Sequence, residues 1–136
     1  MSQLVLPPDH SKKLLRISFL SLGSCIFALL NSVYDGAYVA GSVFLFSINY
    51  WRNPVYGTRR NIDITNNLLC LAYQTWRCFS VATPFTLGFL LFTYAGLGCF
   101  FVSRHLDDRL GTVAHMFTHI LANIGNLILY TGLALS

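Results

Sequence analysis

Long apolar runs alternate with short polar connections along the chain, and this alternation predicts membrane helices. Five hydrophobic segments stand out, each near the roughly 20 residues that a helix needs to cross a bilayer. The second segment is the shortest, and only the tight Asp35-Gly36 turn separates it from the first. We therefore predict an all-α bundle of about five transmembrane helices, which cover residues 14–33, 36–51, 64–82, 84–103 and 112–134.

Composition supports one integral, multi-pass membrane domain over residues 1–136. Hydrophobic residues make up 54% of the chain and charged residues 10%, whereas a soluble domain carries about 25% charged residues. A soluble domain of this size could not keep so much apolar surface out of water. The basic residues are scattered among the connections and form no stripe, so we expect no nucleic acid partner. The expected partners are the lipid bilayer, other membrane protein subunits or a lipid substrate.

Positive charges gather in alternate connections, which predicts the orientation of the bundle. Of the nine basic residues, all but Arg77 precede the first segment or lie in the second and fourth connections. Lys and Arg favour cytoplasmic connections, so the N-terminus is predicted to be cytoplasmic and the C-terminus to lie on the opposite side. Arg77 should lie roughly 20 Å across the membrane. The other basic residues are Lys12, Lys13, Arg16, Arg52, Arg59, Arg60, Arg104 and Arg109.

Two predicted helices carry a stripe of polar side chains. Steps of three or four residues keep each stripe on one helical face. Amide and ionisable groups that face lipid are costly, so we expect the two stripes to face each other or a shared hydrated cavity. The stripes are Asp63, Asn67, Cys70, Gln74 and Arg77 in the third segment, and His115, His119, Asn123, Asn126 and Tyr130 in the fifth.

The stripes admit a structural interpretation and a chemical one. Polar side chains hydrogen-bond between membrane helices and fix their packing, at about 0.6 kcal/mol per contact. Alternatively, His115 and His119 have the i, i+4 spacing that lets two imidazoles meet one metal ion. Asp63 and Ser47 are predicted at the same depth. Such a cluster could hold a divalent metal and lower the pKa of its bound water toward neutrality.

The order of these residues resembles the CREST superfamily, which includes the alkaline ceramidases and the progestin/adipoQ receptors. Its members are seven-helix membrane proteins with a zinc held by three histidines near the cytoplasmic side, and their known chemistry is the hydrolysis of lipid amides. By resemblance, His115 and His119 match the final pair of zinc ligands. Ser47 and Asp63 match the catalytic residues that assist the zinc-bound water.

Two features depart from the family pattern. Trp51 occupies the position of the first zinc-binding histidine, about four residues after the serine, so the ligand set is incomplete unless His105 replaces it. The chain also has five predicted helices rather than seven. Loss of one hairpin keeps the parity that leaves the final histidine pair on the cytoplasmic side.

Three functions are compatible with these patterns. The missing histidine favours a non-enzymatic scaffold or subunit of a membrane complex. The first alternative is a metal-dependent membrane hydrolase of lipid amides or esters, with zinc as its cofactor, with Ser47 and Asp63 as catalytic residues, and with His115, His119 and Asp63 as metal ligands. The second alternative is a small transporter or channel that uses the polar stripes as its pathway.

Overall fold

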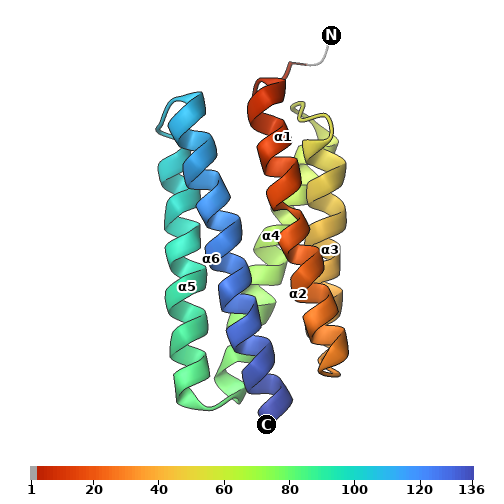
Figure 1. The fold of residues 1–136 in the computed structure, drawn as a ribbon, viewed down its shortest axis with the longest axis vertical. Helices are drawn as coiled ribbons and strands as arrows, with labels where there is room; N and C mark the ends of the chain where they lie inside the picture. Colours follow the sequence, from red (N-terminus) through yellow and green to blue (C-terminus); the bar gives the residue numbers. More distant parts are fainter. Residues whose placement is uncertain (1–2) are drawn as a thin grey trace.

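The computed structural model describes residues 3–136 and has an all-α architecture, which confirms the predicted fold class. The helical rods run alternately up and down, and the two termini lie at opposite ends of the bundle (Figure 1). The elements are α1 (Pro8–Ile17), α2 (Phe19–Leu30), α3 (Tyr34–Trp51), α4 (Thr58–Arg77), the 3-10 turn η1 (Cys78–Ser80), α5 (Thr83–Ser103) and α6 (Asp108–Leu135).

α1 and α2 form one bent rod that corresponds to the first predicted helix. The Ser18 hydroxyl at the bend donates a hydrogen bond to the carbonyl oxygen of Leu14 at 2.7 Å. Serine side chains that bond back by one turn in this way often bend helices. The rod ends at Leu30 rather than at residue 33, because Ser32 takes a positive φ of 58°.

Three predicted helix starts are wrong, since each helix extends beyond its apolar run into polar sequence. The first helix begins at Pro8 rather than at residue 14, and proline is well suited to a first helical position. α4 begins at Thr58 rather than at residue 64, after Gly57, whose φ of 136° is almost restricted to glycine. α6 begins at Asp108 rather than at residue 112, because Asp107 accepts a hydrogen bond from the Leu110 N–H as its N-cap.

The other predicted bounds lie closer to the observed ones. α3 begins at Tyr34 rather than at residue 36, and α5 begins at Thr83 rather than at residue 84. The third predicted helix was extended to residue 82, whereas α4 ends at Arg77 and tightens into η1 before the connection to α5. A short 3-10 turn of this kind commonly ends an α-helix.

Three helices are long and apolar enough to cross a membrane: Pro8–Leu30, Thr83–Ser103 and Asp108–Leu135. α3 and α4 do not reach the same standard of length and hydropathy. α4 is long enough, with 20 residues, but its polar stripe lowers its hydropathy. That α3 and α4 also cross the membrane remains a prediction.

The basic residues gather at one end of the bundle, as the sequence predicts. The start of α1 and the α3–α4 and α5–α6 connections all lie at the end that holds the N-terminus (Figure 1). Arg77 belongs to the end of α4, where its Nε lies 2.9 Å from Oδ2 of Asp35. We call the end that holds the N-terminus the upper end and the other the lower end. The assignment of the upper end to the cytoplasm remains a prediction.

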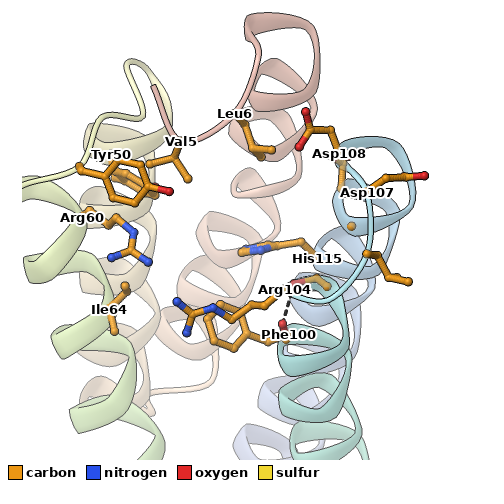
Figure 2. A pocket seen from close by; sticks show the side chains of 15 residues that line it. Val5, Leu6, Tyr50, Arg60, Ile64, Phe100, Arg104, Asp107, Asp108 and His115 are labelled. Carbon is orange, nitrogen blue, oxygen red and sulfur yellow. Dashed lines mark hydrogen bonds between the residues drawn. The ribbon is translucent and has the colours of Figure 1, made fainter. Parts of the chain in front are cut away.

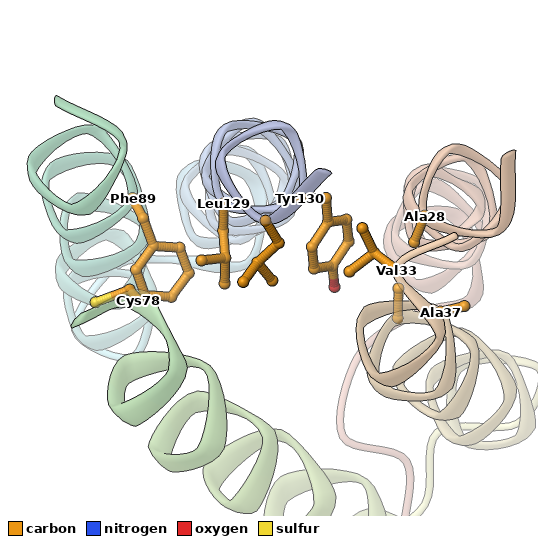
Figure 3. Packing of buried hydrophobic residues seen from close by; sticks show 9 residues of the cluster. Ala28, Val33, Ala37, Cys78, Phe89, Leu129 and Tyr130 are labelled. Carbon is orange, nitrogen blue, oxygen red and sulfur yellow. The ribbon is translucent and has the colours of Figure 1, made fainter. Parts of the chain in front are cut away.

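α6 is the central helix of the bundle, and its side chains separate α5 from α2 and α3 (Figure 3). The closest approach is between α5 and α6, where a Cβ on Gly125 or Gly132 would collide with the facing helix. α4, in contrast, packs mainly on α3. The core consists of a small upper cluster of Leu14, Tyr50 and Trp51, and a larger lower cluster of Ala28, Val33, Ala37, Ala40, Cys78, Phe89, Leu129, Tyr130 and Leu133.

Candidate functional site: a cavity between helices α4, α5 and α6

The two polar stripes share a cavity of about 210 Å³, as predicted, except for their last residues, Arg77 and Tyr130, which do not line it. The cavity lies between α4 and the α5–α6 pair, in the region that α4 leaves open by packing on α3. Its walls are mainly apolar and include Ile64, Leu71 and Leu97. The polar groups that line it are Asp63, Asn67, Cys70 and Gln74 from α4, and His115, His119, Asn123 and Asn126 from α6.

The last residue of the predicted α4 stripe does not share this cavity. Arg77 lies near the end of α4 and binds Asp35, and its Nη1 also donates to Ser80 at 2.8 Å. Asp35 accepts a further hydrogen bond from the Tyr73 hydroxyl at 2.7 Å. This cluster joins the start of α3 to the end of α4.

The lower end of the cavity is closed by hydrogen bonds between helices. Gln74 Nε2 donates to Asn126 Oδ1 at 2.9 Å, which joins α4 to α6. The hydroxyl of Tyr130 lies 2.6 Å from Gln74 Oε1 and 3.0 Å from the carbonyl oxygen of Gly36. Asn123 accepts a hydrogen bond from Ser24 Oγ at 2.6 Å. These side chains form hydrogen bonds between helices, which is the structural interpretation that the sequence allows for polar residues inside the bundle.

At the upper end of the cavity, the polar side chains form few hydrogen bonds with other residues from 3 to 136. The rings of His115 and His119 stack with centroids 5.2 Å apart, and neither imidazole hydrogen-bonds to another group within residues 3–136. Asp63 is 5% exposed. The only hydrogen bond of its side chain in this part of the chain comes from Ser47 Oγ at 3.0 Å. Ser47 is 1% exposed and lies behind the carboxylate rather than in the cavity wall.

Two further polar side chains of the cavity wall lack partners. The buried Thr93 Oγ1 has no hydrogen-bond partner, and the amide of Asn67 forms none with any residue from 3 to 136. Asn67 belongs to the polar stripe that the sequence predicts, whereas Thr93 does not. Thr93 is inconspicuous there because a threonine in a membrane helix ordinarily bonds back to its own backbone.

Trp51 lies against the histidine pair. Its ring centroid is 5.3 Å from that of His115, with the two rings nearly perpendicular, and Phe100 contacts the same imidazole at 5.6 Å. Trp51 lines the cavity and is 5% exposed. Position 51 is therefore adjacent to the histidine pair, as the family resemblance implies. It presents an indole, however, whose nitrogen donates a hydrogen bond and offers no lone pair to a metal.

A resident zinc ion fits the site only in part. Two imidazoles on one tetrahedral zinc, with Zn–N bonds of about 2.0 Å, hold their ring centres roughly 5 Å apart. The separation of His115 and His119 agrees with that value. Within residues 3–136, however, no three His, Cys, Asp or Glu side chains come close enough to hold a metal ion. His105 is exposed in the α5–α6 connection and lines neither this cavity nor the pocket above it.

A second pocket of about 270 Å³ opens at the upper end of the bundle, and we call it the mouth pocket (Figure 2). It shares Ile64, Phe100 and His115 with the cavity, so the two spaces meet at the histidine pair. Two arginines that the sequence marked only as topology signals or loop charges, Arg60 and Arg104, line it. The remaining wall is Val5, Leu6, Tyr50, Tyr56, Ser103, Leu106, Asp107, Asp108, Gly111 and Thr112.

No protein-family model matches the chain, and no curated protein or solved structure is significantly similar to it. The functional argument therefore depends on the geometry of the cavity and on the residues that carry the family resemblance.

Proposed function

We propose that the protein is a non-enzymatic membrane protein that holds one amphipathic molecule between α4, α5 and α6 and serves as a scaffold or subunit of a membrane complex. The observation that carries this proposal is the indole of Trp51 against His115. A three-histidine metal centre lacks a ligand at that position. The protein nevertheless has a cavity next to this position, with unpaired polar groups along one side.

The chemistry of the cavity favours an amphipathic ligand. Ligand pockets are mostly apolar, with a few polar groups that fix the orientation of the bound molecule. Here the apolar walls meet Asn67 and the histidine pair. Leu68 lines the cavity and is also 57% exposed on the outside of the bundle. A lipid can therefore enter sideways from the bilayer, between α4 and α5.

The test is retention of a lipid by the full chain, measured by native mass spectrometry after extraction in mild detergent. Wild type should carry one amphipathic molecule per chain. Ala122→Phe should lose it, because Ala122 lines the cavity and a phenyl ring would fill the space. Ala72→Phe is the matched control, since Ala72 is exposed on α4 and lies outside the cavity wall. Equal lipid retention by both variants, or none by wild type, would contradict the proposal.

The role as a subunit is supported by the outer face of α4. Asn61 and Thr65 are exposed there, and polar groups that face lipid are costly unless a neighbouring protein covers them. We expect native electrophoresis of solubilised membranes to show the chain in a complex larger than the monomer. Replacing both residues with leucine should shift it to the monomer. A wild-type monomer would contradict this part of the proposal.

The metal-dependent lipid hydrolase is the second candidate, favoured by the spacing of His115 and His119 and by the Ser47–Asp63 hydrogen bond. Under our proposal, elemental analysis of purified wild type finds well below one zinc per chain. Trp51→His, which adds a third imidazole next to His115, should bind about one. If wild type binds a full equivalent of zinc that His115→Ala removes, the hydrolase becomes the better interpretation.

A transporter or channel is the least supported of the three functions. The cavity ends at the hydrogen bonds that join Gln74 to Asn126 and Tyr130. A pathway across the bundle would have to break them. Ion or solute flux in proteoliposomes that Asp63→Asn abolishes would favour a transporter over our proposal.

A further inference from the structure

We propose that the mouth pocket binds the phosphate group of a single-chain phospholipid, with Arg60 and Arg104 as its two cationic ligands. This inference rests on the proposed function and names the chemical class of the bound molecule. The acyl chain of the lipid lies in the cavity below.

The two arginines come from opposite sides of the mouth pocket. Arg60 belongs to the first turn of α4, and Arg104 follows the end of α5. Figure 2 shows both guanidinium groups directed into the space between these elements, near His115. A guanidinium group presents a planar set of N–H donors that matches the oxygens of a phosphate, and two such groups can grip one phosphate from two sides.

Each guanidinium group is held in place by an aromatic ring rather than by a carboxylate. Arg60 Cζ lies 5.2 Å from the ring centroid of Tyr56, and Arg104 Cζ lies 5.6 Å from that of Phe100. A cation over the face of an aromatic ring is attracted by the negative charge of that face. These contacts fix the side chain while its N–H donors stay available to a ligand.

Neither arginine forms a salt bridge with any residue that the structure describes. The single salt bridge within residues 3–136 joins Arg77 to Asp35 at the lower end. The neighbouring arginines are used differently. Arg52 donates to the side chain of Asn49, and Arg59 donates to the backbone carbonyl oxygens of Asn49, in the last turn of α3, and Asn53, in the connection that follows. Both arginines of this pocket therefore carry a charge that no carboxylate of residues 3–136 neutralises through an ion pair.

Two acidic residues also line the mouth pocket, and both serve the start of α6. Asp107 is the N-cap and accepts the hydrogen bond from Leu110 N–H, and Asp108 occupies the first helical turn. Negative charge at a helix N-terminus is stabilised by the helix dipole. In Figure 2 both aspartates lie on the far side of the pocket from the two guanidinium groups. The phosphate position we propose is the side that Arg60 and Arg104 share.

The size and continuity of the two spaces argue for one acyl chain. The mouth pocket and the cavity meet at His115, and their volumes are about 270 Å³ and 210 Å³. Together they fall in the lower part of the roughly 300–1,000 Å³ range of ordinary ligand pockets. From Arg60 to Gln74 the path along α4 is about 21 Å. A phosphate above one extended chain suits this narrow, long shape, whereas two chains do not.

The experiment compares lipid probes on the full chain in nanodiscs of uncharged phosphatidylcholine. Native mass spectrometry should show lysophosphatidic acid binding at least tenfold more tightly than a monoacylglycerol with the same chain. Arg60→Gln/Arg104→Gln should remove this preference and leave monoacylglycerol binding unchanged. Arg52→Gln/Arg109→Gln is the matched control, because it removes two charges from the same end of the bundle at residues that do not line the pocket. Each single variant, Arg60→Gln or Arg104→Gln, provides the same readout if the double variant does not fold.

The outcomes separate this inference from the proposed function. Equal binding of the charged and uncharged lipid by wild type would overturn the phosphate site and leave the lipid cavity standing. Binding of neither lipid would overturn both. Inorganic phosphate that displaces lysophosphatidic acid at equal concentration would identify a site for free phosphate, and would also overturn the inference.

Discussion

Polar residues lie at both ends of the space between α4 and α6, but they form hydrogen bonds between helices mainly at the lower end. At the lower end, Gln74 and Asn126 hydrogen-bond to each other, and Tyr130 joins them to the backbone of α3. At the upper end, His115 and His119 line a cavity and hydrogen-bond to no group within residues 3–136. The polar groups of the lower end hold helices together. At the upper end the two histidines have no such partner within residues 3–136, and Asp63 has only the hydroxyl of Ser47.

This difference has an energetic meaning. A polar group removed from water without a partner costs about 1–3 kcal/mol. His115 and His119 are half-buried in the cavity wall, so a chain that only needed to pack would favour apolar residues at these positions. Natural proteins depart from such local rules mainly at functional sites. We therefore expect the lower end to contribute stability and, under the proposed function, the upper end to bind the ligand. Substitutions at the two ends should have opposite consequences.

The largest expected effect is at the lower end. Tyr130 is fully buried in the lower cluster, and Tyr130→Ala should lower the free energy of unfolding by about 3–5 kcal/mol through the cavity it creates and the hydrogen bonds it removes. Reversible unfolding in mixed micelles measures this loss. Tyr38→Ala is the control, because Tyr38 is 80% exposed on α3. Similar losses for the two variants would show that Tyr130 does not anchor the lower end.

A smaller loss is expected from the hydrogen-bond network itself. Gln74→Leu removes the partner of both Asn126 and Tyr130, and interhelical hydrogen bonds in membranes contribute about 0.6 kcal/mol each, with a maximum near 1.7. We expect a loss of about 1–2 kcal/mol in the same unfolding assay. Adding Asn126→Leu should cost less than the sum of the two single changes, because the amides are coupled. Strict additivity would mean that the two amides do not interact.

The sequence predicts the polar stripes well, because spacing alone decides which residues share a helical face. It also indicates that position 51 lies near the final histidines, through the resemblance. The sequence does not reveal that the side chain of Arg77 points away from the cavity. Arg77 forms a salt bridge with Asp35, which belongs to the start of another helix. Nor does spacing tell whether two facing stripes touch or enclose a cavity, because that depends on how α4 packs on α3.

The mouth pocket was not predicted for a related reason. Arg60 lies in the first turn of α4 and Arg104 follows α5, far apart in the chain, and nothing in the sequence around either residue shows that they face the same space. The helix starts were placed too late because apolar runs mark the hydrocarbon, whereas α4 and α6 continue into polar sequence. Arg60 therefore lies on a helix rather than in a loop, and the helix fixes the direction of its side chain.

The smallest effect on stability is expected where the polar group has no partner. His119→Leu removes an imidazole that pairs with no residue from 3 to 136 and puts an apolar side chain into the cavity wall. Replacing an unpaired buried polar group with an apolar one is nearly neutral or stabilising. The free energy of unfolding should therefore change by less than about 0.5 kcal/mol, or rise, while lipid retention in native mass spectrometry falls.

His119→Asn is the informative partner of that variant, since it keeps a polar group at the same place. It should retain more lipid than His119→Leu if the imidazole hydrogen-bonds to the bound molecule. A loss of stability in His119→Leu as large as that of Gln74→Leu would show that the upper histidines bind other helices, as the lower amides do. In that case the upper end is structural too, and the unpaired side chains around it no longer indicate a ligand.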